Sequence, residues 1–144
     1  EIGQYLAVEG NEKGTVTGRD RRCGWFDAPL VRRSCLLNGV TSLALTKIDV
    51  LDRLEKIRIC VGYRVGKEEF SDFPVTTSIA NTLTPIYEEI DGWKSSTVGL
   101  EKIDQMPTQA RIYIQRIEEL TESNVSIIST GPERNQTIFI NNPF

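Results

Sequence analysis

A short loop rich in glycine, threonine and arginine is the segment whose residue types could do the most chemistry. Residues 14–22 read Gly-Thr-Val-Thr-Gly-Arg-Asp-Arg-Arg. Guanidinium groups bind carboxylates and phosphates through paired donors. Glycine lets backbone N–H groups approach an anion, and threonine adds hydroxyl donors. The composition therefore predicts an anion-binding loop, with an exposed polar loop between two helices as the plainer alternative.

A second candidate segment has the residue types that recognise a purine base. Lys47 and Asp49 directly follow the apolar run at 42–46. A carboxylate can accept hydrogen bonds from both N1–H and the exocyclic amine of guanine, a donor pair that adenine lacks. The stem and charge of a lysine can cover the base. A solvated surface pair is the alternative interpretation.

A third candidate segment, Ser-Thr-Gly at 129–131, follows the apolar run at 125–128. Its hydroxyl and backbone donors could bind a base or a phosphate, although Gly-Pro also marks ordinary turns. Ligands of α/β proteins bind just beyond the carboxyl ends of strands, which favours both this segment and the one at 46–49. The glutamate pairs at 88–89 and 118–119 are expected to be solvated, because adjacent residues do not face a common point.

Composition limits the classes of protein and of site. The chain has 144 residues, enough for one modest domain, and a net charge of −3, which argues against a dedicated nucleic-acid binder. No apolar run is long enough to span a bilayer, and the first residues lack signal-peptide character. The three cysteines lack metal-ligand spacing, which favours a reduced cytoplasmic setting. The absence of histidine excludes imidazole chemistry within these residues.

Hydrophobic periodicity predicts helices interleaved with short strands, and therefore an α/β class with mixed sheet strands and flanking helices. We expect helices at 1–10, 28–38 and 107–123, the second capped by Asp27 and ended by Gly39. Expected strands cover 42–46, 57–65, 85–90, 125–128 and 137–140, with a short turn or helix at 50–54 and a loop with room for a short strand at 66–84.

Side-chain directions follow from the same periodicity. The strand at 57–65 should alternate strictly, with its odd-numbered residues on one face. The last helix should bury Ala110, Tyr113, Ile114, Ile117 and Leu120 and expose Arg116, Glu118 and Glu119. Arg32 and Arg33 are expected on the outer face of their helix, and Trp25 and Phe26 are expected to anchor the core.

Taken together, these segments closely resemble the adenylosuccinate synthetase family. The resemblance rests on 14–27, 45–52 and 128–134, which occur in the family's order, and 59–64 and 113–120 also fit. It spans nearly all of residues 1–144, taken as a single region, but only the C-terminal portion of the family enzyme. Two departures are Pro29, where an aliphatic residue is usual, and Arg53, where many members have glycine.

The resemblance implies a ligase of purine nucleotide biosynthesis on the route to AMP. GTP phosphorylates the 6-oxygen of IMP, and L-aspartate displaces the phosphate to give adenylosuccinate, GDP and phosphate. It also implies a cytoplasmic homodimer that requires Mg²⁺ and has no nucleic-acid or membrane partner. The catalytic groups, the metal ligands and the phosphate-binding glycine loop are expected in an N-terminal part, so the 144-residue piece alone is expected to be inactive.

The resemblance also assigns a role to each candidate residue. The loop at 14–22 would close on aspartate through Thr15, Val16, Thr17, Gly18, Arg19, Asp20 and Arg21. Arg19 would also reach IMP, and Arg21 the GTP phosphates, while Arg22 receives no role. GTP would further contact Lys47, Ile48 and Asp49 of segment 46–49 and Ser129, Thr130 and Gly131 of segment 129–132.

Two other functions stay open on the residues alone. One is a guanine-nucleotide-binding module without catalysis, which needs only the segments at 46–49 and 129–131. The other is an RNA- or protein-interaction domain that uses Arg19, Arg21, Arg22, Arg32 and Arg33. Affinity for nucleic acid would fall steeply with salt, whereas guanine recognition would depend on it far less.

Overall fold

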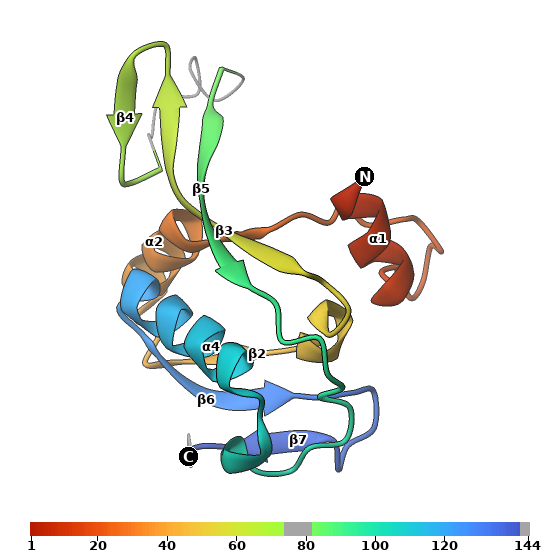
Figure 1. Ribbon diagram of the computed structural model, residues 1–144. Helices are drawn as coiled ribbons and strands as arrows, with labels where there is room; N and C mark the ends of the chain where they lie inside the picture. The colour runs from red at the N-terminus through yellow and green to blue at the C-terminus, as the bar shows by residue number, and fades with distance from the viewer. Residues whose placement is uncertain (74–81, 142–144) are drawn as a thin grey trace.

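Two small sheets with helices around them make up the computed structural model, which describes residues 1–73 and 82–141 (Figure 1). The first sheet contains β1 (Phe26–Asp27), β3 (Lys56–Val65), β4 (Glu68–Phe70) and β5 (Thr84–Asp91). The second contains β2 (Ser42–Leu45), β6 (Asn124–Ser129) and β7 (Thr137–Phe139). β1 runs parallel to β3 and β2 parallel to β6, whereas the other pairs are antiparallel. The predicted α/β class with mixed strands is confirmed.

Among the described residues, the α-helices are α1 (Ile2–Glu9), α2 (Ala28–Asn38) and α4 (Thr108–Thr121), accompanied by the 3-10 helices η1 (Ile48–Leu51) and η2 (Ile103–Gln105). α2 begins and ends where its capping residues predict. The Asp27 carboxylate accepts a hydrogen bond from Leu30 N at 3.1 Å, and Gly39 ends the helix with φ 61°. Within the described ranges, no helix has both the length and the apolar character needed to cross a membrane.

The core forms where α4 contacts β5 of one sheet and β6 of the other (Figure 1). The predicted stripe of α4 is confirmed, because Ala110, Tyr113, Ile114 and Ile117 are buried and Leu120 is half-buried against the core. Ile57 and Ile59 come from β3, and Val125 and Ile128 from β6. Trp25 and Phe26 are half-buried and pack on this core, as predicted. Burial of these side chains is the main source of stability.

The strict alternation predicted for β3 is wrong at its centre. The pairing with β5 passes from Cys60↔Tyr87 to Gly62↔Ile86, so Val61 is an extra residue in the ladder. This bulge shifts the parity of the strand, and the neighbours Ile59 and Cys60 just before it are both buried. The backbone of β4 approaches closely here, since a Cβ atom on Gly62 would lie 2.7 Å from Phe70 O.

Several side chains predicted to face solvent have partners instead. The Glu118 carboxylate accepts from Val125 N at 2.7 Å, and the Arg116 guanidinium pairs with Glu88 at 2.8 Å. Arg32 donates to the Ser71 carbonyl at 3.1 Å. β2, expected to be buried, is only half-buried, because within the described residues it pairs with β6 alone and lies at the sheet edge. The short strand allowed for within 66–84 is β4, and 74–81 lie outside the described residues.

Candidate functional site

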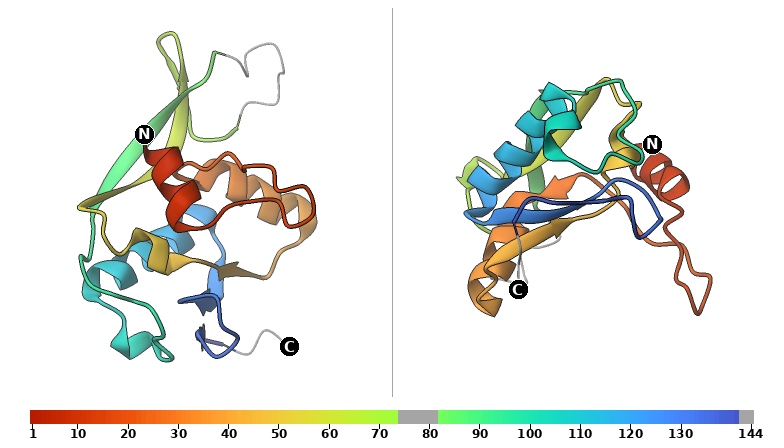
Figure 2. Two further views of the ribbon diagram at one scale, coloured as in Figure 1. Left: turned by 90° about the vertical axis from the view of Figure 1, so that its right-hand side faces the viewer. Right: turned by 90° about the horizontal axis from the view of Figure 1, so that it is seen from below.

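The arginine loop projects from the body of the protein between α1 and β1 (Figure 2). Its base is closed by an antiparallel bridge between Lys13 and Asp20. Gly18, at φ 64°, supplies the left-handed turn, and its N–H donates to the Gly14 carbonyl at 2.8 Å. The side chain of Val16 at the tip is 96% exposed. The tip therefore contributes almost nothing to the core and is accessible to a ligand.

The arginine side chains of this loop differ in their hydrogen-bond partners. No side-chain partner of Arg19 or Arg22 is found in the described part of the chain. The Arg21 guanidinium, by contrast, donates through Nη1 to Glu12 Oε2 at 3.0 Å, and Arg21 N donates to the Glu12 carbonyl at 3.0 Å. Arg21 is thus oriented by the protein, while Arg19 and Arg22 are free to adapt to a ligand.

Glu12 also binds Lys47, and this contact joins the arginine loop to the segment after β2. Lys47 Nζ donates to Glu12 Oε1 at 2.5 Å and to the Gly10 carbonyl at 2.5 Å. The hydrogen bond from Lys47, with the charge of Lys47 and the hydrogen bond and charge of Arg21, holds the pKa of Glu12 below its usual value, although burial acts in the opposite direction. Sequence analysis missed Glu12, because it stands alone between a helix and a loop and belongs to no motif.

The two segments predicted to bind guanine lie side by side. Leu45 of β2 is in register with Ile128 of β6, and the strands are parallel, so residues 46–49 and 129–131 leave the same edge of the sheet. Lys47 takes a left-handed conformation, φ 60°, and η1 then begins at Ile48. Ile48 is buried in the core, so only its backbone is available to a ligand.

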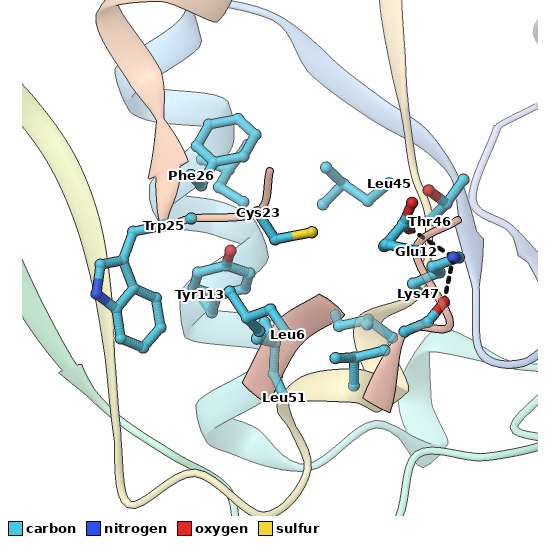
Figure 3. Close-up of a pocket in the computed structure, with 15 residues that line it drawn as sticks. Leu6, Glu12, Cys23, Trp25, Phe26, Leu45, Thr46, Lys47, Leu51 and Tyr113 are labelled. Atoms are coloured by element: carbon cyan, nitrogen blue, oxygen red, sulfur yellow. Dashed lines mark hydrogen bonds and ion pairs between the residues drawn. The ribbon is translucent and has the colours of Figure 1, made fainter. Parts of the chain in front are cut away.

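Lys47 and Asp49 line two neighbouring cavities, which have Val50 in common. Lys47 lies at one end of a cavity of about 270 Å³, beside Glu12 (Figure 3). The rest of that cavity is largely apolar and includes Leu6, Trp25 and Tyr113. Burial raises the pKa of Tyr113, so its phenol stays neutral.

Asp49 is the carboxylate with the least satisfied environment. Its Oδ1 atom is buried and has no hydrogen-bond partner among the described residues. Burial, with a smaller contribution from the Asp52 charge, raises the pKa of Asp49 above its ordinary value of 3.8. A second cavity borders it, lined by Tyr5, Asp52 and other polar residues. An unpaired buried acceptor costs free energy, which is typical of an atom that a ligand satisfies.

The loop at 129–131 is braced by contacts that sequence analysis also missed. Asp52 accepts hydrogen bonds from Trp93 Nε1 at 2.7 Å, Thr97 N at 2.7 Å and Thr97 Oγ1 at 2.8 Å. The segment after Thr97 holds the loop in turn, because Thr130 Oγ1 donates to the Leu100 carbonyl at 3.0 Å. Thr130 N donates to the Gln136 carbonyl at 2.9 Å. These contacts fix the loop's shape without a ligand.

Some of the hydrogen-bonding groups of this loop therefore already have partners within the protein. The Thr130 side chain is fully buried, and Ser129 Oγ donates to the Gly131 carbonyl at 2.9 Å. A Cβ atom on Gly131 would lie 2.2 Å from Gln136 Oε1, so a side chain here would displace the Gln136 amide, which accepts from Glu133 N. The backbones of Ser129 and Gly131, which are half-buried, are what a ligand could reach, whereas Thr130 is fully buried.

The described part of the chain offers no group of three His, Cys, Asp or Glu side chains that could hold a metal ion. The residues described here do not fit a magnesium site, and we assign them no metal ligand. Cys23, Cys35 and Cys60 are free thiols. Cys60 is buried, and burial raises the pKa of its thiol, which disfavours the reactive thiolate.

Comparison with known proteins gives one consistent family. The family model for adenylosuccinate synthetase matches residues 1–138. The chain is 51% identical over 143 residues to the adenylosuccinate synthetase of Herminiimonas arsenicoxydans, covering 99% of this chain and 33% of that protein. It is 47% identical over 144 residues to that of Marinobacter nauticus, covering 100% and 33%.

A solved structure agrees with the sequence comparisons. Fully ligated adenylosuccinate synthetase from Plasmodium falciparum matches with a TM-score of 0.90 and 36% identity, over 97% of this chain and 34% of that chain. The chain thus spans about a third of the length of these relatives. By sequence and by fold, it belongs to the adenylosuccinate synthetase family.

Proposed function

We propose that the protein carrying this chain is a GTP-dependent ligase that joins IMP and L-aspartate to give adenylosuccinate, GDP and phosphate. Family membership and the names of the relatives support this reaction. Within this chain, the observation that carries the proposal is the common sheet edge of 46–49 and 129–131, joined to the arginine loop through Glu12.

The chain's contribution to GTP binding is guanine recognition. The Asp49 carboxylate accepts hydrogen bonds from N1–H and the exocyclic amine of guanine, which satisfies its unpaired Oδ1 atom. The Lys47 stem covers the base, and the backbone of Ser129, Thr130 and Gly131 closes the other edge. Ile48 contributes through its backbone, since its side chain is buried.

The arginine loop binds L-aspartate. Thr15, Val16, Thr17, Gly18 and Asp20 form the flexible frame, and Arg19 and Arg21 supply the guanidinium donors for carboxylates. Arg19, which has no side-chain partner in the described residues, also reaches IMP, while Arg21, held by Glu12, extends to the GTP phosphates. The Mg²⁺ ligands and the acid–base groups lie outside this chain, and a cytoplasmic homodimer is part of the proposal.

Nucleotide selectivity of an Asp49→Asn variant of the full-length protein tests the proposal. Inosine triphosphate lacks the exocyclic amine of guanine, so the unaltered protein should prefer GTP over it. The asparagine amide cannot accept both guanine hydrogen bonds, and we expect the KM for GTP to rise by about tenfold or more. The preference for GTP over inosine triphosphate should largely disappear.

Asp104→Asn is the matched control, because Asp104 is an exposed aspartate of η2. It should leave both KM values unchanged. An unchanged ratio of GTP to inosine triphosphate selectivity in Asp49→Asn would refute the role of Asp49.

Binding without chemistry is the second candidate function for the isolated piece, because the guanine segments are complete within it and fixed by their own contacts. We expect the 144-residue piece to bind GTP in calorimetry and to form no adenylosuccinate. The RNA-binding hypothesis is less favoured, since Arg21 and Arg32 are already engaged within the chain and the net charge is −3.

A further inference from the structure

Glu12 lies where two parts of the proposed site meet, although nothing in the proposed chemistry requires a carboxylate there. It is only 20% exposed at its side chain, and its two oxygens are divided between two cations. Oε1 accepts from Lys47 of the guanine segment, and Oε2 accepts from Arg21 of the arginine loop. In the described chain, no backbone hydrogen bond joins the segment of Lys47 to the arginine loop that carries Arg21.

Each of these contacts leaves its cation in a form suited to the proposed role. The Lys47 ammonium is satisfied by Glu12 and the Gly10 carbonyl, so the side chain offers its aliphatic stem, rather than a free charge, to the base. Arg21 gives Nη1 to Glu12 and keeps its remaining donors for an anion. A guanidinium held on one edge loses less rotamer entropy when it binds.

We propose that Glu12 is a positioning residue that couples guanine recognition to the aspartate loop by holding Lys47 and Arg21 on one carboxylate. This inference rests on the proposed function. Glu12 itself touches neither substrate. Because the pKa of Glu12 is lowered by its cationic partners, the carboxylate stays ionised throughout the neutral range.

Steady-state kinetics of Glu12→Gln in the full-length protein test the coupling. The neutral amide cannot attract both cations, so we expect the KM for GTP and the KM for L-aspartate each to rise roughly fivefold. The kcat and the KM for IMP should stay within about twofold, since Glu12 does not contact Arg19. A purely structural lesion would instead lower the apparent kcat, because KM is independent of the fraction of enzyme that is folded.

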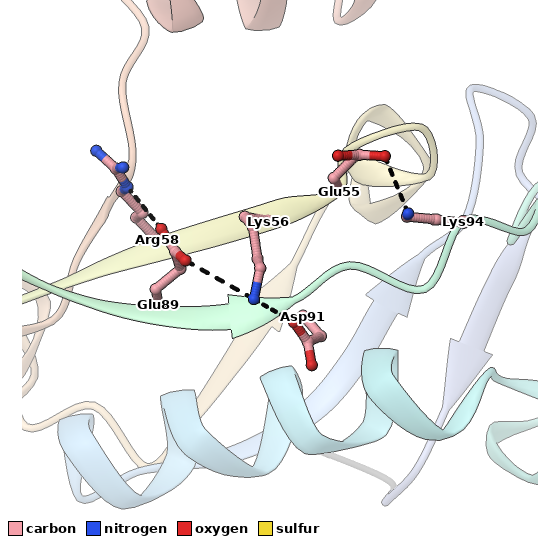
Figure 4. Close-up of polar contacts among 6 residues, drawn as sticks. All are labelled: Glu55, Lys56, Arg58, Glu89, Asp91 and Lys94. Atoms are coloured by element: carbon pink, nitrogen blue, oxygen red, sulfur yellow. Dashed lines mark hydrogen bonds and ion pairs between the residues drawn. The ribbon is translucent and has the colours of Figure 1, made fainter.

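Glu89 provides a matched control on the exposed face of β3 and β5 (Figure 4). Its carboxylate also lies between a lysine and an arginine, at 3.8 Å from Lys56 Nζ and 3.3 Å from Arg58 Nε. Glu89→Gln makes the same chemical change and should leave every kinetic constant unaltered.

Unchanged KM values for both substrates in Glu12→Gln, or a rise in only one of them, would overturn the coupling. If this variant does not fold, Glu12→Asp replaces it. The shorter side chain keeps the charge but cannot reach both cations, so at least one KM should rise, and no rise in either overturns the inference. The Asp49→Asn experiment fails or succeeds independently, because it reads base selectivity rather than the response to aspartate.

Discussion

Glu12 and Glu89 are two carboxylates with partners of the same kind, but they differ in solvent exposure and in how the backbone around them is held. Each lies between a lysine and an arginine, yet the Glu12 side chain is 20% exposed and that of Glu89 is 43% exposed. Glu89 stands in a ladder where β3 and β5 are already fixed by backbone pairing. The Glu12 carbonyl is paired with Arg21 N, but no backbone hydrogen bond joins the arginine loop to the Lys47 segment in the described structure. A bridging carboxylate therefore matters most where the backbone does not already determine the geometry.

Asp52 extends this comparison to a buried carboxylate, only 9% exposed, and its replacement should give the largest effect. Asp52→Ala removes the acceptor of three hydrogen bonds, from Trp93 and Thr97, and leaves buried donors unpaired. We expect local stability to fall by about 3 kcal/mol. Native-state hydrogen exchange of the Thr97 and Thr130 amides measures this change directly. Equal protection in the variant and the parent would contradict the brace between Asp52 and the loop at 129–131.

Asp49 should show a smaller effect of the opposite sign. Its folded-state pKa is raised, so its charged form is penalised in the folded protein at pH values above the ordinary 3.8. Asp49→Asn removes this penalty and should raise stability near neutral pH by about 0.5 kcal/mol or less, after allowance for partial solvent exposure. The gain should shrink as pH falls through the folded-state pKa, where Asp49 becomes neutral. The unfolding midpoints of the variant and the parent, compared from pH 7 down to about pH 4, check the sign of this change in stability.

Glu89→Gln should give the smallest effect. Many exposed ion pairs contribute nothing measurable to stability, and the strand pairing persists without this one. We expect the thermal midpoint to stay within about 2 °C of the parent at low salt. A larger drop in the thermal midpoint would show that the exposed face of β3 and β5 depends on Glu89 as strongly as the arginine loop and the Lys47 segment depend on Glu12. The comparison would then fail.

Features fixed by neighbouring residues could be predicted from the sequence. Asp27, Pro29 and Gly39 define α2 because capping is a local interaction. The apolar runs of β2 and β6 also placed the two segments proposed to bind guanine directly after strands, and the parallel pairing of those strands brings the segments together.

Features that depend on distant side chains could not be predicted. Glu12 and Lys47 are 35 positions apart, and Asp52 and Thr97 are 45 apart, so neither contact leaves a local pattern. The bulge at Val61 arises from the register with β5, which periodicity within one strand does not encode. Such contacts depend on the packed fold rather than on the propensity of any segment.

The exposed tip of the arginine loop offers an experimental handle. Val16 has almost no contact with the rest of the protein, so its replacement should leave folding unaffected. A fluorophore attached at residue 16 would therefore report motion of the loop through changes in its own surroundings. If the loop closes on L-aspartate as proposed, its signal should differ between nucleotide alone and nucleotide with L-aspartate.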